Sequence, residues 1–283
     1  KQKQILKKAC KKLMKNIAFL DLKMEKTKIF LVETNVEEQN RTKYTGNGSY
    51  PLGLAYLDAV LRKEGYEVVT KDFAQFKEED CLKETKKIIQ KFNPEILGIS
   101  MMSMTRVSSY KLMKIAKKIN PKIKIILGGI HASVLYEQLL KNFPIECIVI
   151  GEAEETIKEI IPALLLNKVN HNWNSIKGIA FRKGNKIIKT PERDLIHDLD
   201  NLPFPSHDSF MNPNRIRIVL LSSRGCPNKC SFCALHIISR RRYRMRTYKN
   251  VVDEIEQTVS KFPQIREIEF SDDTFTLFEQ RVI

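Results

Sequence analysis

Residues 123–133 read IKIILGGIHAS and contain one unit of the pattern that decides the fold. The short apolar run predicts a buried strand, the two glycines predict a tight loop, and helical periodicity follows. The same succession occurs five times between residues 29 and 166. The predicted strands are Ile29–Glu33, Glu67–Lys71, Ile96–Ser100, Ile123–Leu127 and Cys147–Ile150, and the predicted helices are Leu52–Glu64, Asp80–Phe92, Ser108–Ile119, Ser133–Asn142 and Glu155–Leu166. We therefore predict an α/β domain at 29–166, built on a doubly wound parallel sheet.

The alternation stops after this domain. Residues 167–212 predict a linker that contains a hairpin over Gly178–Thr190 and a stiff stretch with two prolines. In residues 213–283 a strand, a helix and a second strand are predicted: Ile216–Leu221, Val251–Phe262 and Ile265–Phe270. A parallel βα barrel needs on the order of 200 residues. We therefore expect only the first βα units of an incomplete barrel here.

The charge of the chain is unevenly distributed. The formal net charge of +16 comes mostly from a lysine-rich extension at residues 1–28 and from the run Arg240–Asn250. No apolar run approaches the roughly 18 residues of a membrane helix, and no signal peptide is visible, so a soluble, cytoplasmic protein is expected. The six cysteines are too few for a disulfide scaffold, and three of them gather within eight residues. Composition alone leaves nucleic acid open as a partner.

Ligands of open parallel sheets bind at the carboxyl ends of the strands. Three predicted strands are followed there by small or polar residues suited to close approach of a ligand. After the third, fourth and fifth strands the sequence reads SMMSMT at 100–105, GGIH at 128–131 and GE at 151–152. Neither Gly-x-Gly-x-x-Gly nor Gly-x-x-x-x-Gly-Lys follows the first strand, which argues against a dinucleotide or a nucleoside triphosphate.

The strongest chemical signal is the run GCPNKCSFC at residues 225–233. Cys226, Cys230 and Cys233 supply three thiolates, whereas an iron–sulfur cubane usually takes four. One iron would then be open to chelate a small molecule and transfer one electron to it. The alternative is a zinc site, which His236 could complete as a Cys3His set.

Two parts of the sequence resemble a known family of enzymes. The run YPLGLAYLDAVLR at 50–62, with LGGIH at 127–131 and GEAE at 151–154, resembles the cobalamin (B12)-binding domain of radical S-adenosylmethionine enzymes. The cysteine run, with YRMRT at 243–247 and IEFSDDTF at 268–275, resembles their radical domain. The order of the two parts is similar to that of the anaerobic magnesium-protoporphyrin ester cyclase and the B12-dependent radical methyltransferases.

This resemblance implies a flavodoxin-like first domain and three cofactors: cobalamin, a [4Fe–4S] cluster and S-adenosylmethionine. In that family the loops after the third and fourth strands hold cobalamin, which would place it against Ser100, Met102, Gly128 and Gly129, and Gly151 and Glu152 after the fifth strand are further candidates. The cluster would be ligated by Cys226, Cys230 and Cys233, and S-adenosylmethionine would lie against Phe232, Asp272 and Asp273. The implied reaction is reductive cleavage of S-adenosylmethionine for methyl transfer or radical modification. Its substrate would be a small molecule of lipid or tetrapyrrole type, and its electron donor a flavodoxin or ferredoxin.

The sequence also departs from related families. Cobalamin mutases and methionine synthase supply an imidazole to cobalt from Asp-x-His-x-x-Gly, but residues 72–77 after the second strand read DFAQFK and contain no histidine. Bound cobalamin would therefore lack this lower histidine, an arrangement that the radical family tolerates. One alternative function is a non-catalytic corrinoid-binding module with a vestigial cluster segment. A second alternative is an RNA-modifying methylthiotransferase, which would use the arginines at 240–246. The loop after the first strand lacks the cysteine of that group. Nucleic acid is therefore the less favoured partner, and anion contact is the favoured role for the arginines.

Overall fold

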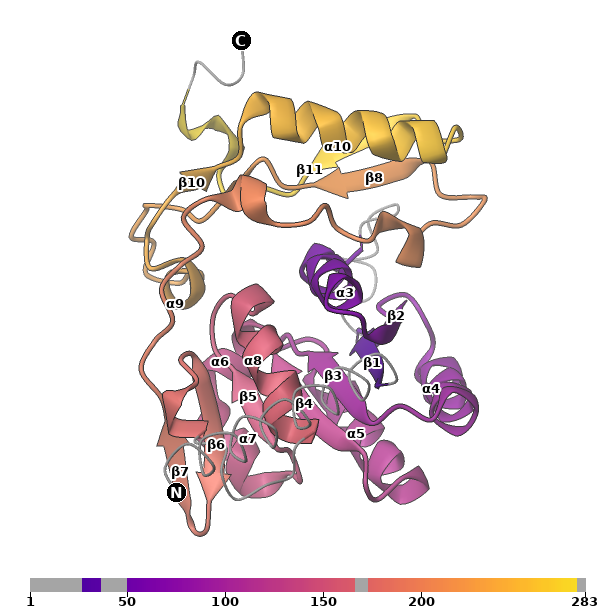
Figure 1. Cartoon of the computed structure of the whole chain (residues 1–283), viewed down its shortest axis with the longest axis vertical. Helices are drawn as coiled ribbons and strands as arrows, with labels where there is room; N and C mark the ends of the chain where they lie inside the picture. Colours follow the sequence, from indigo (N-terminus) through magenta and orange to yellow (C-terminus); the bar gives the residue numbers. More distant parts are fainter. Residues whose placement is uncertain (1–26, 37–49, 166–172, 279–283) are drawn as a thin grey trace, which may run out of the picture.

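The computed structural model describes residues 27–36, 50–165 and 173–278. Almost all of the predicted basic extension lies outside these ranges. Five parallel strands form the body of one sheet, in the order β2-β1-β3-β4-β5 (Figure 1). Their bounds are β1 Lys28–Glu33, β2 Glu67–Asp72, β3 Ile96–Ser100, β4 Lys124–Gly128 and β5 Cys147–Val149. The strand order reverses between β1 and β3, as in flavodoxin-like folds, which confirms the predicted architecture.

The predicted hairpin also forms, as β6 (Ile179–Lys183) and β7 (Lys186–Lys189). It does not stand apart in a linker, because β6 pairs antiparallel with β5 and brings the sheet to seven strands. The hairpin thereby covers the edge of β5, which would otherwise expose unpaired backbone groups.

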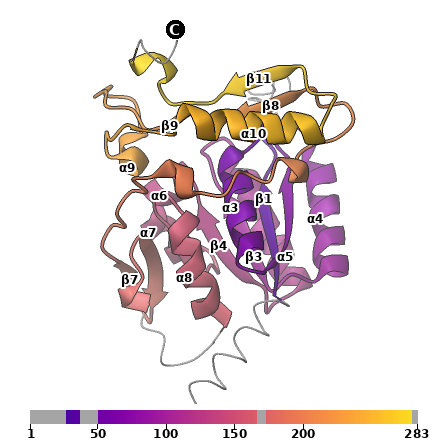
Figure 2. The same cartoon turned by 45° about the horizontal axis from the view of Figure 1, so that its top comes forward.

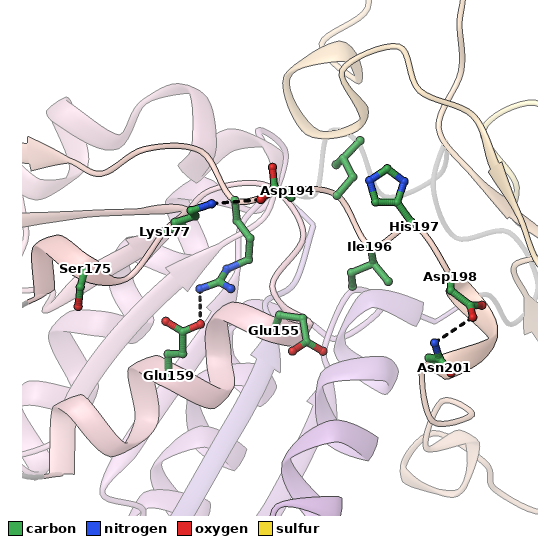
Figure 3. A pocket seen from close by; sticks show the side chains of 11 residues that line it. Glu155, Glu159, Ser175, Lys177, Asp194, Ile196, His197, Asp198 and Asn201 are labelled. Carbon is green, nitrogen blue, oxygen red and sulfur yellow. Dashed lines mark hydrogen bonds and ion pairs between the residues drawn. The ribbon is translucent and has the colours of Figure 1, made fainter.

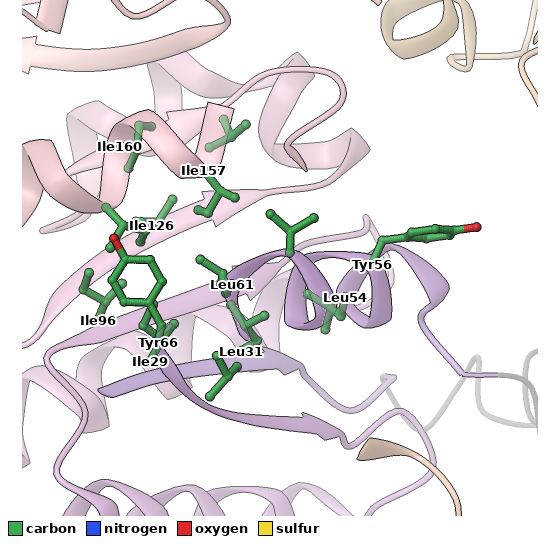
Figure 4. Packing of buried hydrophobic residues seen from close by; sticks show 14 of the residues in the cluster. Ile29, Leu31, Leu54, Tyr56, Leu61, Tyr66, Ile96, Ile126, Ile157 and Ile160 are labelled. Carbon is green, nitrogen blue, oxygen red and sulfur yellow. The ribbon is translucent and has the colours of Figure 1, made fainter. Parts of the chain in front are cut away.

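Helices cover both faces of the sheet. On one face lie α3 (Leu52–Lys63) and α8 (Glu154–Leu165), whose apolar side chains pack on alternate strand residues (Figure 4). The other face is covered by α4 (Glu78–Phe92), α5 (Arg106–Ile119), α6 (Ile130–Val134) and α7 (Tyr136–Asn142). In β1, Ile29 and Leu31 join the first core, whereas Phe30 and Val32 join the second. This alternation follows from the two-residue period of a strand, and burial on both faces explains why residues 29–32 of β1 are all apolar.

Residues 216–278, which we call the C-terminal segment, form a βαβ unit that lies over the carboxyl edge of the sheet (Figure 2). The strands β8 (Arg217–Leu220) and β11 (Glu267–Phe270) pair in parallel and are connected through α10 (Tyr248–Lys261). Between them lie β9 (Ser223–Arg224), α9 (His236–Ser239) and β10 (Arg244–Met245), and β9 pairs antiparallel with β10. Ile218, Leu220 and Ile265 form a small core of their own.

The connection from the hairpin to this segment contains only short 3-10 turns. They span Leu199–Asn201 and His207–Ser209, and similar turns lie at Trp173–Ser175 and Phe275–Leu277. The connection nevertheless packs on the first domain, since Leu199 and Phe210 are buried in the same core cluster as the apolar residues of α3 and α8. No helix within the described ranges is both long and apolar enough to cross a bilayer.

Candidate functional site

A cavity of about 600 Å³ lies at the carboxyl ends of β1, β3 and β4, between the sheet, α3, α8 and the C-terminal segment. It is lined by all six residues that the resemblance assigned to cobalamin: Ser100, Met102, Gly128, Gly129, Gly151 and Glu152. Thr105, Ile130 and His131, which belong to the same strand-end loops, are not among the lining residues. At Gly128 and Gly151 an added Cβ would meet nothing within 4 Å, so both glycines border open space. Gly129 has φ +90°, and its Cβ would lie 2.7 Å from the carbonyl oxygen of Met101. The glycines thus keep both the loop shape and the room for a ligand.

The cavity has a long apolar side, which suits a large organic ligand. Strand residues Ile29, Ile96 and Ile126 face helix residues Ile157 and Ile161 across it. Gly98 in β3 also lines this side, and a Cβ there would lie 2.7 Å from a methyl carbon of Leu31. Polar side chains line the cavity at the strand ends and in the C-terminal segment, and Tyr50, Tyr56 and Glu154 add polar groups near α3 and α8. A flat corrin and its nucleotide tail need this combination of an apolar slot with a polar mouth, so the residues present fit cobalamin.

Two carboxyl groups that were absent from the prediction lie at one end of the cavity. Glu33 and Asp72 end β1 and β2, and they are opposite each other in the register. Burial, with the nearby charge of Asp72, raises the pKa of Glu33 to about 7, although the Ser100 hydroxyl donates to its carboxylate at 3.2 Å. Burial also raises the pKa of Asp72. Their positions at neighbouring strand ends were the signal that could have identified them.

We expect Glu33→Gln to change how the stability of the protein depends on pH. The folded protein holds the Glu33 proton from its ordinary pKa of 4.5 up to about 7, whereas the unfolded chain has released it. The unfolding free energy therefore falls as pH rises through this window. The Gln variant should lose that decline, about 1–3 kcal/mol, in urea unfolding between about pH 4.5 and pH 7. Glu256→Gln, on an exposed helix position, serves as the control. An undiminished decline in Glu33→Gln would contradict the assignment.

The three cysteines of the motif share one loop at the roof of the cavity. Gly225, directly before Cys226, and Leu235, two residues after Cys233, both line the cavity. A hydrogen bond with Thr274 and one with the Asn228 backbone lower the pKa of the Cys226 thiol. Within the described ranges no three His, Cys, Asp or Glu side chains converge closely enough to hold a metal ion. Three free thiols on one loop are the donor set that an iron–sulfur cluster takes, so the residue types fit the group.

The remaining metal and cysteine predictions can be placed as follows. His236, the residue needed for a zinc site, has Nδ1 at 2.8 Å from the carbonyl oxygen of Cys233. Cys81 and Cys147 are fully buried in the cores of the first domain. Burial raises the pKa of the Cys81 thiol to about 11, so both behave as packing residues. Cys10 lies outside the described residues.

Asp272 and Asp273, predicted to contact S-adenosylmethionine, are engaged with the start of the cysteine loop. Asp272 accepts hydrogen bonds from the Ser222 amide at 2.7 Å and from the hydroxyls of Ser222 and Ser223 at 2.5 and 2.6 Å. Asp273 accepts from the Gly225 amide at 2.8 Å and also lines the cavity. Phe232 is 91% exposed. The contact of these three residues with S-adenosylmethionine stays a prediction.

The arginine run divides into buried and exposed members. Arg244 pairs with Glu152 at 2.7 Å, and Arg246 pairs with Glu254 at 2.5 Å. Arg240 reaches Glu192 at 3.0 Å, whereas Arg241 and Arg242 are exposed. The predicted contact of this run with anions is therefore met in part by carboxylates of the chain itself. Two of the arginines that suggested RNA binding are thus buried in ion pairs.

A second cavity, of about 550 Å³, lies beside α8 and the connection (Figure 3). Its charged groups are paired with one another, with 3.1 Å between Lys177 and Asp194 and 2.6 Å between Arg193 and Glu159. Exposed pairs of this kind contribute little and leave few groups for a ligand. The first cavity is therefore the candidate site.

Comparison with known proteins supports this choice. Residues 43–161 match the B12 binding domain family. An uncharacterized methyltransferase of Pyrococcus horikoshii is 33% identical over 267 residues, which cover 92% of this chain and 56% of that protein. The anaerobic magnesium-protoporphyrin IX monomethyl ester cyclase of Rubrivivax gelatinosus is 32% identical over 225 residues, or 75% of this chain and 39% of the cyclase.

Similarity extends to three dimensions. The structure of the cobalamin-dependent S-adenosylmethionine radical enzyme OxsB with aqua-cobalamin bound matches with a TM-score of 0.73 and 20% identity, over 89% of this chain and 34% of that chain. The chain spans about half the length of the methyltransferase above and about a third of OxsB. It therefore carries a B12-binding domain followed by a segment with the fold of cobalamin-dependent radical S-adenosylmethionine enzymes, the enzymes that it resembles in sequence and in structure.

Proposed function

We propose that this chain binds cobalamin and a [4Fe–4S] cluster at one shared site and takes part in reductive cleavage of S-adenosylmethionine. The cleavage would serve methyl transfer or radical modification of a small molecule. One observation carries the proposal: the cavity at the strand-order reversal is roofed by the residues that flank the three cysteines. A corrinoid in the cavity would lie directly beneath the cysteine loop. The names of the relatives, a methyltransferase and a tetrapyrrole cyclase, support this chemistry.

Each group of residues would have a distinct task. The glycines at 128, 129 and 151 would let the backbone approach the corrin, and the apolar side would exclude water. Cys226, Cys230 and Cys233 would ligate the cluster, and Asp272 would hold the start of their loop. When bound, the cluster supplies one electron to S-adenosylmethionine, and cobalamin supplies a carrier for a methyl group. A flavodoxin or ferredoxin would provide the electron.

Gly128→Val is expected to abolish cobalamin binding without unfolding the protein. An added Cβ at this residue meets no protein atom within 4 Å, so the new side chain enters the cavity and not the core. Hydroxocobalamin titration followed by absorbance should show saturable binding to the wild type and at least about a tenfold loss in the variant, or about 1.4 kcal/mol. Thermal unfolding of Gly128→Val should stay close to that of the wild type. Equal affinity of the wild type and the variant for hydroxocobalamin would show that cobalamin does not bind in this cavity.

Anaerobic reconstitution with iron and sulfide tests the cluster. We expect a brown protein with about four irons per chain if a cubane assembles. Replacement of Cys226, Cys230 and Cys233 by alanine should reduce the iron to background, whereas Cys81→Ala, which removes a buried thiol far from the loop, should retain it. A wild type that binds zinc and no iron would refute the cluster. Cobalamin binding without any cluster would instead favour the non-catalytic corrinoid-binding module.

A further inference from the structure

Glu152 lies between the cavity and the C-terminal segment that carries the cysteine loop. It follows β5, next to Gly151, and both residues line the cavity. Its carboxylate is nevertheless fully occupied: Arg244 donates to both oxygens at 2.7 and 2.9 Å, and the Ile196 amide donates at 3.0 Å. The guanidinium of Arg224 also lies 3.5 Å from the Glu152 carboxylate. These hydrogen bonds and positive charges outweigh burial and lower the pKa of Glu152. Its partners thus come from the C-terminal segment and the connection, and leave no oxygen free for a corrinoid.

Arg224 extends these contacts toward the cysteines. Its guanidinium pairs with Glu154 at 2.6 Å and stacks over the Tyr56 ring at 4.8 Å. Only 13% of the Arg224 side chain and 6% of the Glu154 side chain are exposed. Arg224 therefore belongs to the C-terminal segment by sequence, but its two ion pairs are with Glu152 and Glu154 of the first domain.

The step from Arg224 to the first cysteine is short and stiff. Only Gly225 separates Arg224 from Cys226, and its amide is fixed by Asp273 at 2.8 Å. Gly225 has φ +89°, and its Cα faces the carbonyl oxygen of Arg242 so closely that a Cβ would lie 2.0 Å from it. A shift of the loop after β5 must therefore move Arg224, and with it the backbone that carries Cys226.

From these contacts we infer that Glu152 is a positioning residue that couples the cobalamin cavity to the cysteine loop. The inference rests on the proposed function. A corrinoid that orders the loop after β5 stabilises Cys226 in place through the paired arginines. By thermodynamic reciprocity, a cluster held by the cysteines tightens cobalamin binding by the same factor. Glu152 thus acts through Arg224 and Arg244 and does not contact cobalamin itself.

The test compares hydroxocobalamin affinity in the apo-protein and in the anaerobically reconstituted protein. In the wild type we expect the cluster to tighten binding on the order of tenfold. In Glu152→Gln the ratio of the two dissociation constants should fall close to one, because the neutral amide cannot hold two arginines. Glu152→Asp, which keeps the charge, should recover part of the ratio. A general loss of stability would weaken both affinities and leave their ratio unchanged.

Glu155→Gln provides the matched control, since Glu155 is three residues further along, is 46% exposed and pairs with Lys158 on the surface. It should keep the wild-type ratio. Arg224→Lys alters the arginine partner of Glu152 and Glu154 and should also lower the ratio of the two dissociation constants. It serves as a second test if Glu152→Gln does not fold. A wild-type ratio of one, or an unchanged ratio in the folded Glu152 or Arg224 variants, would overturn the inference. Absence of cobalamin binding in the wild type would instead overturn the proposed function.

Discussion

Glu254→Ala is expected to lower the free energy of unfolding by about 3–5 kcal/mol, because it leaves a buried guanidinium without its counter-charge. Glu254 is completely buried in α10, and its carboxylate lies 2.5 Å from Arg246, which is itself 3% exposed. The other oxygen lies 2.9 Å from Nε2 of His207. His207 Nδ1 in turn contacts the hydroxyl of Tyr50, at the start of α3. The variant thus removes the central residue of a buried series of polar contacts that joins the C-terminal segment to the first domain.

Urea unfolding of the wild type and the variant measures this loss. Glu256→Ala, on the exposed side of the same helix, should change the unfolding free energy by no more than about 0.5 kcal/mol. Glu254→Gln can keep one hydrogen bond to His207 but not the charge, so an intermediate loss is expected. A loss below about 1 kcal/mol in Glu254→Ala would show that water or a rearranged partner compensates Arg246.

Gly225→Ala is expected to reduce cluster incorporation to a small fraction of the wild-type iron content. The alanine Cβ would lie 2.0 Å from the carbonyl oxygen of Arg242, which is backbone and cannot rotate away. Relief of this overlap must separate the start of the cysteine loop from the backbone at Arg242, and it is expected to weaken the hydrogen bond from the Gly225 amide to Asp273. Cys226, the next residue, would move with it.

Gly184→Ala is a control that distinguishes the overlap at residue 225 from the backbone strain of any alanine with positive φ. Gly184, in the β6–β7 turn, has φ +59°, but a Cβ there meets nothing within 4 Å. It should cost about 1–2 kcal/mol for the left-handed backbone alone, with no effect on iron. Iron content after reconstitution and thermal unfolding are the two measurements. Wild-type iron content in Gly225→Ala would contradict the tight packing at this residue.

The arrangement of strands and helices could be predicted because each strand of the first domain is buried and bounded by turns. Ile96–Ser100 was predicted with its observed bounds, and the other strands and most helices differ by one to three residues. The helix predicted at Ser133–Asn142 is in fact two, α6 and α7, with a break at Leu135 (φ −104°, ψ 28°). Apolar periodicity continues across the break, so it gave no sign of the change in direction.

The site could be predicted only in part. A glycine directly after a predicted strand can be recognised from local sequence, and Gly128, Gly129 and Gly151 do line the same cavity. The ion pair between Glu152 and Arg244 could not be predicted from local sequence. The two residues are 92 positions apart and pair only once the C-terminal segment covers the sheet edge. Glu33 and Asp72 likewise become neighbours only through the β1–β2 register.

The packed connection between the hairpin and β8 has one further consequence. Its backbone bonds to the first domain, with the Ser206 amide donating to Ala55 at 2.9 Å, and the ring of Phe210 stacks on Tyr50 at 5.0 Å. Residues that would be a protease-sensitive tether in a loosely joined protein are here part of the core, together with Leu199 and Leu202. The two parts therefore cannot swing apart as rigid bodies. Their separation would require local unfolding of the connection and loss of its contacts with the start of α3.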